Sequence, residues 1–535
     1  MNRRYPGMLG ACLLGACVFS SQASAELIID PDGLGWTNVD PAYIATYPRA
    51  DYYDYLFIGH GGPGAVEVNA NLLGNGYTEA YSLGVIQVGA STTQYPTGGP
   101  GLLRVIGDGS YDSARVIGED YFSVGIGGDG SVEVRDGGYI AAAQIQLGAA
   151  NYDADILVDG SNSVLESFAG GIFFSGSGLG NTRSLTVSNG ARLQTWGIYD
   201  PSNWESGSIE LQQGDRFTLN TDALATFEMS VQNRGTIEIL GGAALQQIEP
   251  VGIIDSLPPA LHPLGYMSMK VGGTDQVASV RISDSFSEID LTRNMQIGGY
   301  NQAVDLVPDG NGGYVVIEEA TAGAVTVEND GNLNVGGTIY ISENGTGGSG
   351  TLTVRGGGQI TATSVVVNEG GTLNGSAGSV IGDVILEGGT LAPGNSPGYM
   401  EIYGDLIVNQ GVIDLEIAGT GYGEYDELYI LGNSVFSADT TINLRFINGF
   451  APSAYDDFNL VWGNTGISGL DLVTINVLGL EAGFEYDIFS NTYGDISLFA
   501  LNDGIATSVV PVPTAVWLFG SGLIGLAAVG RRRRA

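Results

Sequence analysis

Two short motifs in this chain contain residue types that could perform nucleophilic catalysis. The sequence His-Gly-Gly-Pro-Gly at residues 60–64 could form an oxyanion-hole loop, and Gly-Asn-Ser-Pro-Gly at residues 394–398 matches the Gly-x-Ser-x-Gly pattern of serine hydrolases. A nucleophilic serine of that kind needs a strand before it and a helix after it. Here Pro397 follows Ser396 directly, and no helical pattern comes next. The other histidine, His262, lies in a proline-rich segment, so we predict no catalytic residues and no enzymatic activity.

Residues that could bind a metal ion are also few. Asp330, Asn332 and Asn334 imitate the start of a calcium loop of the EF-hand type. However, Val335 stands where that loop needs glycine, and Ile341 stands where it needs glutamate. Asp and Asn are also common in turns, because they tolerate the backbone geometry there. We predict no cofactor and no specific metal site, with loosely bound Ca²⁺ as the one compatible ion.

The body of the chain is strongly acidic. All 58 Asp and Glu residues lie between the two terminal segments described below, and six of the 19 basic residues lie inside those segments. The body therefore has 13 basic residues, of which Lys270 is the one lysine, and a net charge of about −45. Such a surface repels nucleic acid, so we predict no nucleic-acid partner. Apolar residues make up 43% of the chain and charged residues 14%, which supplies a core and argues against disorder.

Residues 1–25 have the pattern of a secretory signal peptide. Two arginines precede the apolar segment 8–19, and Ala23 and Ala25 frame a cleavage site, which makes signal peptidase an expected partner. An alternative is lipoprotein processing at Cys17, within Leu-Gly-Ala-Cys. The chain's only other cysteine, Cys12, also lies in this segment, so cleavage after Ala25 leaves a body without thiols or disulfides.

Short alternating strands that end in Gly or Asn-Gly turns recur along the body. Equivalent positions Val134, Val158 and Val187 are 24 and 29 residues apart, and Val327 and Val354 are 27 apart. The sequence Gly-Gly-Thr-Leu at residues 370–373 recurs 18 residues later. Irregular periods of this length, each holding two or three strands, are typical of a β-solenoid whose inward residues stack into a column. A string of antiparallel β-sandwiches is the alternative, since some turn spacings are as short as that fold requires.

These repeats define a domain organisation. We expect an N-terminal cap at residues 26–54, solenoid repeats at 55–430 and a loop insertion at about 250–264, where four prolines cannot continue a sheet ladder. Residues 431–505 are richer in aromatics and lack the glycine-turn repeat, so we predict a β cap there, because an open solenoid end is a bare sheet edge. The sequence Gly-Gly-Thr-Leu-Ala-Pro-Gly-Asn-Ser-Pro-Gly at residues 388–398 resembles the passenger repeats of autotransporter-type surface proteins. That resemblance implies a right-handed parallel β-helix.

The last 26 residues combine a Pro-x-Pro box, an apolar stretch at 514–530 and a terminal arginine cluster. A helix over 514–530 is about 25 Å long, just enough to span a bilayer, and the arginines behind it stay cytoplasmic. This arrangement resembles the PEP-CTERM sorting signal, which implies processing by an exosortase-like enzyme. Val512 replaces the glutamate that is usual in that box. The residues that carry the resemblance, within 510–535, are Val510, Pro511, Val512, Pro513, Trp517, Arg531, Arg532, Arg533 and Arg534.

Together these features predict an exported all-β solenoid with a C-terminal β cap and one C-terminal transmembrane helix. We expect it to be anchored in the inner membrane before processing and then to reach the cell surface or the extracellular matrix. The resemblance implies a structural or adhesive role, linked to exopolysaccharide, biofilm or other surface glycans. Two alternatives remain open: an enzyme that degrades extracellular polysaccharide, and a Ca²⁺-dependent adhesin.

Overall fold

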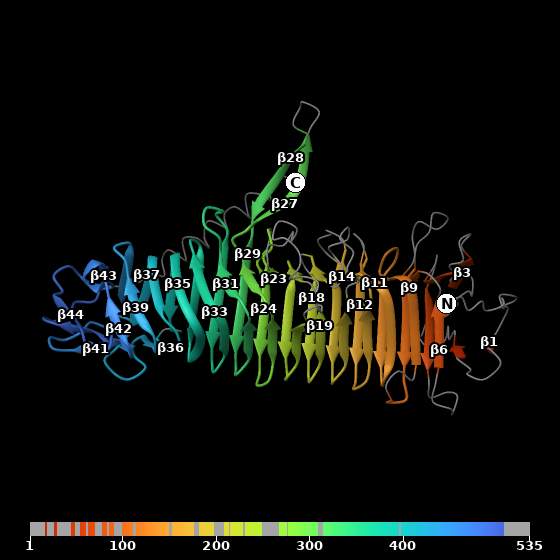
Figure 1. Ribbon diagram of the computed structural model, residues 1–535, viewed down its shortest axis with the longest axis horizontal. Coiled ribbons are helices and arrows are strands. Elements are labelled where there is room, and N and C mark those ends of the chain that lie inside the picture. The colour runs from red at the N-terminus through yellow and green to blue at the C-terminus, as the bar shows by residue number, and fades with distance from the viewer. Residues whose placement is uncertain are drawn as a thin grey trace, which may run out of the picture.

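The computed structural model describes residues 99–507, except for gaps at 111–113, 149–151, 176–180, 197–207, 213–214, 228–229, 249–266, 275, 309–313 and 395–396. Before residue 99 it describes residues 17–18, 26–28, 44–48, 54–59, 63–69, 78–82 and 85–89. The chain forms a long rod in which short strands run across the long axis (Figure 1). Successive coils of the chain pair in parallel and form three ladders, here called ladders 1, 2 and 3.

Ladder 1 contains fifteen strands in the described part of the chain, and the chain passes from it to ladder 2 and then to ladder 3 in each coil. At roughly 4.8 Å per strand, this ladder spans about 65 Å. Its strands are β5 (Gly64–Asn69), β8 (Gly101–Ile106), β10 (Gly130–Arg135), β12 (Ala154–Asp159), β15 (Arg183–Ser188), β18 (Arg216–Asn220), β21 (Thr236–Leu240), β24 (Ala278–Ser283), β29 (Ala322–Glu328), β32 (Ser349–Arg355), β34 (Gly371–Ser376), the end of β35 (Gly378–Pro393), the second part of β37 (Leu406–Ile417), β40 (Thr440–Phe446) and β43 (Thr474–Leu478).

Ladders 2 and 3 are built in the same way, and the longer strands bend from one ladder into the next. Ladder 2 contains β6 (Thr78–Ser82), the first parts of β9 (Ala114–Val124) and β11 (Gly138–Leu147), β13 (Val164–Ser167), β16 (Arg192–Thr195), β19 (Leu224–Phe227), β22 (Ala244–Gln247), β25 (Glu288–Leu291), β30 (Asn332–Val335), the first parts of β33 (Gln359–Asn368) and β35, β36 (Tyr399–Ile402), β38 (Glu427–Ile430) and β41 (Asp457–Gly463). Ladder 3 contains β4 (Asp54–Ile58), β7 (Ile86–Val88), the second parts of β9 and β11, β14 (Gly171–Phe174), β17 (Ser208–Leu211), β20 (Val231–Asn233), β23 (Met267–Val271), β26 (Asn294–Ile297), β31 (Thr338–Ile341), parts of β33, β35 and β37, β39 (Asn433–Phe436) and β42 (Gly466–Ser468).

The core is a column of apolar side chains inside the three ladders. Every second residue of a strand points inward and is buried, as the alternating burial along most of these strands shows. The repeat spacing read from the sequence is confirmed residue by residue, because Val134 pairs with Val158, which in turn pairs with Val187. Val327 likewise pairs with Val354. A single coil has no interior of its own, so this stacking is the source of stability.

Glycine occupies the corners for a backbone reason. Gly125 follows the ladder 3 strand of its coil with φ 73°, and a Cβ there would lie 2.6 Å from the carbonyl oxygen of Asp153 in the next coil. The Asn189-Gly190 turn also has positive φ at both residues, 56° and 77°. These are left-handed conformations that Gly and Asn adopt most readily, as the sequence predicts.

Coil length varies widely because the corners accept insertions. Register-equivalent residues are 18 residues apart between Leu373 and Leu391, and 45 apart between Val280 and Val325. The longest coil includes an antiparallel hairpin, β27 (Asn301–Pro308) with β28 (Tyr314–Ala320), that projects from the side of the rod (Figure 1). The sequence does not predict this hairpin. The predicted proline loop at 250–264 falls outside the described residues, between β22 and β23.

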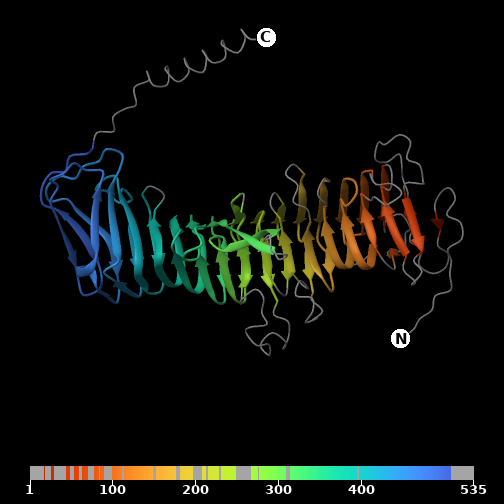
Figure 2. The same cartoon turned by 90° about the horizontal axis from the view of Figure 1, so that it is seen from above.

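The two ends of the rod differ from the coils. At the N-terminal end, antiparallel pairs join β1 (Cys17–Val18) to β2 (Glu26–Ile28), β2 to β5, and β3 (Ile44–Pro48) to β4. At the other end, parallel pairing continues past residue 430, where the cap was predicted to begin, and ends at β43. The antiparallel part is shorter: β44 (Tyr486–Ser490) pairs with β45 (Ile496–Ala500), and β45 pairs with β41. The aromatic residues that suggested a change of fold, such as Phe446 and Phe458, are buried inside the last coils instead. Figure 2 shows these coils at one end of the rod.

The prediction of an all-β parallel solenoid is therefore confirmed. One short 3₁₀ helix, η5 (Leu470–Leu472), is the helical element of the described part of the chain. Among the residues that the structure describes, no helix has the length and apolar character needed to cross a bilayer. The predicted transmembrane helix at 514–530 lies outside those residues.

The column model predicts unequal effects of two neighbouring substitutions in β32. Leu352 is buried in the core, so Leu352→Ala should lower the free energy of unfolding by about 3 kcal/mol, through lost burial and the cavity left behind. Thr351 faces outward on the same strand, so Thr351→Ala should change it by less than about 0.5 kcal/mol. Urea unfolding followed by circular dichroism measures both values. Similar losses for the two variants would contradict the inward assignment.

Candidate functional site

The flanking residues of the two motifs with catalytic potential are placed in the described structure, but the candidate catalytic side chains are not among its residues. His60, His262 and Ser396 lie outside the described residues. Gly64 begins β5 and donates a backbone hydrogen bond to the Pro100 carbonyl. Gly394 directly follows β35 and Gly398 leads into β36, so a strand, rather than the helix that a nucleophile elbow needs, follows this motif. The predicted cleavage residues Ala23 and Ala25, and the sorting residues 510–513, 517 and 531–534, also lie outside the described part.

The three residues that imitate a calcium loop lie in a turn and a strand of the solenoid. Asp330 lies in a turn with φ 64°, and Asn332 and Asn334 follow in β30. The Asn334 amide donates a 2.6 Å hydrogen bond to Asp290 in the preceding coil. Within the described ranges, no group of three or more His, Cys, Asp or Glu side chains is placed to hold a metal ion.

Arginines on the outer wall of ladder 1 link neighbouring coils. Arg135 pairs with Glu133 and with Asp159 of the next coil, at 3.2 Å and 3.5 Å. Glu328 lies between Arg281 and Arg355 of the coils on either side, at 2.7 Å and 2.6 Å. Burial acts to raise the pKa of Glu328, but the two guanidinium groups outweigh it and lower that pKa. Arg135 and Arg355 are both well exposed.

Arg183, in contrast to Arg135 and Arg355, is completely buried. Its Nε lies 2.5 Å from Oδ1 of Asp215, which is equally buried, in the next coil. Gly148 leaves room for the arginine, since a Cβ there would lie 2.3 Å from Arg183 Cδ. Burial raises the pKa of Asp215 to about 6, although Arg183 and the Gln212 backbone N–H act to lower it. Among the described residues, the two terminal guanidinium nitrogens have no hydrogen-bond partner, and the ion pair itself joins two neighbouring coils.

Asp426 is a second buried carboxylate, and it organises the Gly-Asn-Ser-Pro-Gly motif. Its Oδ1 accepts the Gly398 N–H at 2.8 Å, and its Oδ2 accepts the Glu416 N–H at 2.8 Å. Gly394 packs directly against the carboxylate, where a Cβ would lie 2.1 Å from Oδ1. Burial raises the pKa of Asp426 to about 7; the two backbone N–H groups act to lower it, and the charges of Glu416 and Asp414 raise it. The two outer glycines of the motif thus form a structural contact with Asp426.

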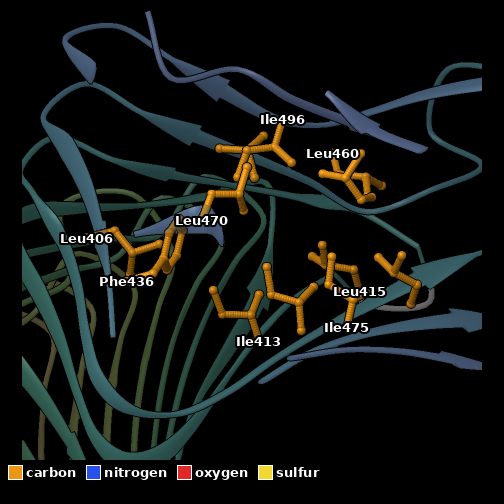
Figure 3. Close-up of a pocket in the computed structure, with 12 residues that line it drawn as sticks. Leu406, Ile413, Leu415, Phe436, Leu460, Leu470, Ile475 and Ile496 are labelled. Carbon is orange, nitrogen blue, oxygen red and sulfur yellow. The ribbon is translucent and has the colours of Figure 1, made fainter. Parts of the chain in front are cut away.

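One cavity in the described structure is lined by apolar side chains alone. It lies inside the last coils and is lined by hydrocarbon side chains, among them Leu406, Phe436 and Ile475 (Figure 3). Its volume of about 10 Å³ is at the lower limit for one water molecule, and its walls offer no polar partner to hold one. It is a packing defect of the column rather than a ligand site.

The best candidate for a binding site is a row of aromatic residues on the outside of ladder 2. We call Tyr399, Tyr429 and Trp462, on successive strands β36, β38 and β41, the aromatic row. The rings of Tyr429 and Trp462 are nearly parallel, with centroids 6.0 Å apart, and Tyr399 meets Tyr429 edge to face at 6.0 Å. Inward residues of the same strands fill the core, so these three rings are additional to it. Trp462 is 41% exposed.

Carboxylates flank the aromatic row. Trp462 Nε1 donates a 2.9 Å hydrogen bond to Glu427, and Glu401 is the register partner of Tyr429. The Glu401 carboxylate accepts a hydrogen bond from the exposed Tyr403 hydroxyl at 2.9 Å. Burial raises the pKa of Tyr429 to about 12, with further contributions from Glu427 and neighbouring tyrosines, so its hydroxyl stays protonated at neutral pH. The surface combines apolar ring area with hydrogen-bond acceptors and donors. The sequence analysis missed it, although Tyr429 and Trp462 can be aligned once the coil register is known.

The fold and this surface define a parallel β-solenoid whose candidate site lies on its wall rather than in a cleft. The sequence has no significant match to a protein-family model or to a curated protein. Among solved structures, it is similar to a hyperglycosylated fragment of TibA modified by TibC, with 13% identity over 66% of this chain and 91% of that one, at a TM-score of 0.31. It is also similar to the Hap adhesin of Haemophilus influenzae, with 12% identity over 79% of this chain and 62% of that one, at a TM-score of 0.17. Superpositions this weak carry no inference about function.

The buried Asp426 carboxylate predicts an unusual pH dependence of stability. Its pKa in the folded state, about 7, lies above the ordinary value of 3.8, so the folded chain binds this proton more tightly than the unfolded chain. The associated stability is fully present below pH 4 and is lost as the pH rises to about 7. The slope is at most about 1.4 kcal/mol per pH unit.

Asp426→Asn removes this titration. At pH 5 the variant should be less stable than the parent chain by about 1–3 kcal/mol, because one buried backbone N–H then faces the amide NH₂. Between pH 5 and 7.5 it should lose less stability than the parent chain. Urea unfolding midpoints at both pH values and constant ionic strength measure this difference. Parallel pH profiles for the two chains would refute the assignment to Asp426.

Proposed function

We propose that this chain is an exported rod with a structural or adhesive role at the cell surface or in an extracellular matrix. The observation that carries the proposal is the continuous outer wall of the three ladders, which repeats outward side chains at the coil spacing over about 65 Å. Weak contacts repeated along such a wall add up through effective concentration. The interior is filled by apolar side chains, so contact chemistry is restricted to this outside surface.

The proposal extends to targeting. A signal peptide at 1–25 would direct export, and a processed C-terminal signal resembling PEP-CTERM would fix the final location. The chain would then be held in the inner membrane by residues 514–530 until an exosortase-like enzyme acts. Exopolysaccharide or another surface glycan is the proposed contact. The high negative charge favours glycans without acidic groups, because anionic ones are repelled.

The two alternatives make separable predictions. A polysaccharide-degrading enzyme would release new reducing or unsaturated ends from acidic or neutral glycans, and the proposed adhesive rod would not. A Ca²⁺-dependent adhesin would show a melting temperature that rises with millimolar Ca²⁺ and falls with chelator. Neither alternative is favoured by a specific feature of the described structure.

Deleting residues 510–535 tests the targeting part. We expect the shortened chain to leave the membrane fraction and to be released in soluble form, because the proposed anchor and arginine stop are removed. Cell fractionation with immunoblotting measures the change, and a chain with Arg531–Arg534 replaced by alanine serves as a milder variant. An unchanged distribution for the deletion would refute the sorting signal and leave the rod itself unaffected.

The aromatic row is the proposed contact for uncharged sugars, whose C–H groups pack on aromatic faces. Trp462→Ala should weaken retention of the full chain in gels containing a neutral glucan by about tenfold, a loss of about 1.4 kcal/mol. Leu472→Ala removes a comparably exposed apolar side chain and should have no effect. Equal retention of the parent chain and both variants would remove the row from the proposal.

A further inference from the structure

The β27–β28 hairpin stands apart from every other strand that the structure describes. It forms a two-stranded sheet of its own, whereas the remaining strands belong to one large sheet. Figure 1 shows it extending away from the side of the rod, and it is here called the arm. At about 3.4 Å per residue, the seven residues of β28 reach roughly 24 Å.

The base of the arm is clamped to the rod. Thr321 is fully buried; its N–H donates to the Tyr300 carbonyl at 3.0 Å, and its hydroxyl accepts the Tyr300 N–H at 3.2 Å. The Tyr300 hydroxyl donates to the Gly272 carbonyl at 3.2 Å, and the Lys270 ammonium lies 5.1 Å from the centre of the Tyr300 ring. These contacts fix the direction in which the arm leaves the rod.

A two-stranded ribbon in water is only marginally stable. The pairing register places Leu306 opposite Val316 and Val307 opposite Val315. Among the described strands, β28 pairs with β27 alone, so no described strand covers its outer edge. Such an edge can form backbone hydrogen bonds with a strand of another chain.

We propose that the arm joins two copies of this chain by antiparallel pairing of β28 with β28 across a two-fold axis at Val316. This register is self-complementary: Val315 lies opposite Ile317 of the second copy, and Tyr314 lies opposite Glu318. A two-fold axis centred on Glu318 would instead place like charges opposite each other. A closed two-fold contact of this kind uses the same surface on both copies.

The distribution of charge along the arm favours contact between two copies of the chain near the tips of their arms. Residues 314–317 are uncharged, and Glu318 and Glu319 lie nearer the base, so overlap of the tips keeps the acidic residues of the two arms apart. The chain as a whole has a net charge of −39, which opposes close association of two rods. An arm of roughly 24 Å exceeds the Debye length of about 8 Å at physiological ionic strength, so the rods are screened from each other.

Cysteine cross-linking tests the contact directly. In a two-fold pairing the Cα atoms of residue 316 in the two copies lie about 4.5–5.5 Å apart, which suits a disulfide. Full chain carrying Val316→Cys should therefore form a disulfide-linked dimer on mild oxidation, seen on a non-reducing gel. Thr351→Cys, on the rod wall, is the matched control, and the parent chain accounts for Cys12 and Cys17. Dimer no stronger than in the Thr351→Cys control would overturn the proposal.

A charge-reversal experiment distinguishes loss of the contact between two arms from misfolding of the variants. Val316→Lys and Val316→Asp should each weaken dimerisation of the full chain by about tenfold or more, and mixing the two should restore it, because opposite charges then meet. Light scattering after size-exclusion chromatography measures the mass. Replacing residues 301–320 by Asn-Gly, a two-residue turn suited to the Tyr300–Thr321 base, should give a monomer with the rod's melting temperature unchanged. A mixture that stays monomeric, or an arm deletion that stays dimeric, would each refute the two-fold arm contact.

Discussion

The parallel register between successive coils is the constraint on which the rest of the structure depends. A coil cannot bury its own apolar side chains, so each coil must place them directly over those of its neighbour, as Val134, Val158 and Val187 do. This requirement fixes the residue type at a few inward positions in each coil, while the corners can vary in length. Coils of 18 and of 45 residues therefore coexist in the same column. The arm belongs to the longest of these coils. Its two ends meet at Tyr300 and Thr321, so it lengthens the coil without interrupting the stacking.

Polar residues act at the same joints between coils. Glu328 is shared by arginines of the coils on either side, and the buried Arg183–Asp215 pair connects two consecutive strands of ladder 1. Removing one partner of a buried pair leaves an uncompensated charge, so such pairs tolerate change in both residues better than in one. Asp426 serves the same purpose with backbone donors in place of a cation. These contacts resist slippage of one coil over the next, which apolar stacking alone permits.

The fold could be predicted because inward apolar residues and glycine corners repeat visibly, even at irregular spacing. The buried charges could not be predicted from residue type, but they follow strand alternation: Arg183 has the same parity as Leu185 and Val187, and Asp426 the same parity as Leu428 and Ile430. Parallel coils extend past the predicted cap boundary because larger inward residues, Phe446 and Phe458, fill the same column there, and a richer aromatic composition alone does not mark a new architecture. The arm escaped prediction because alternating strands look the same whether their partner is the next coil or a hairpin.

The inward side chains and the corners are taken up by the folding of the column. A partner of this chain therefore contacts the outward side chains. On most of the wall these positions hold small polar residues or paired charges, which give weak and uniform contact. The aromatic row lies near the C-terminal end of the rod, and the arm leaves the rod near its middle (Figure 1). Both lie outside the apolar column. Exposed apolar surface on an otherwise acidic wall is where association free energy is available, so the aromatic row adds a local contact to the weak ones that the wall repeats along the rod, and the arm adds a strand edge.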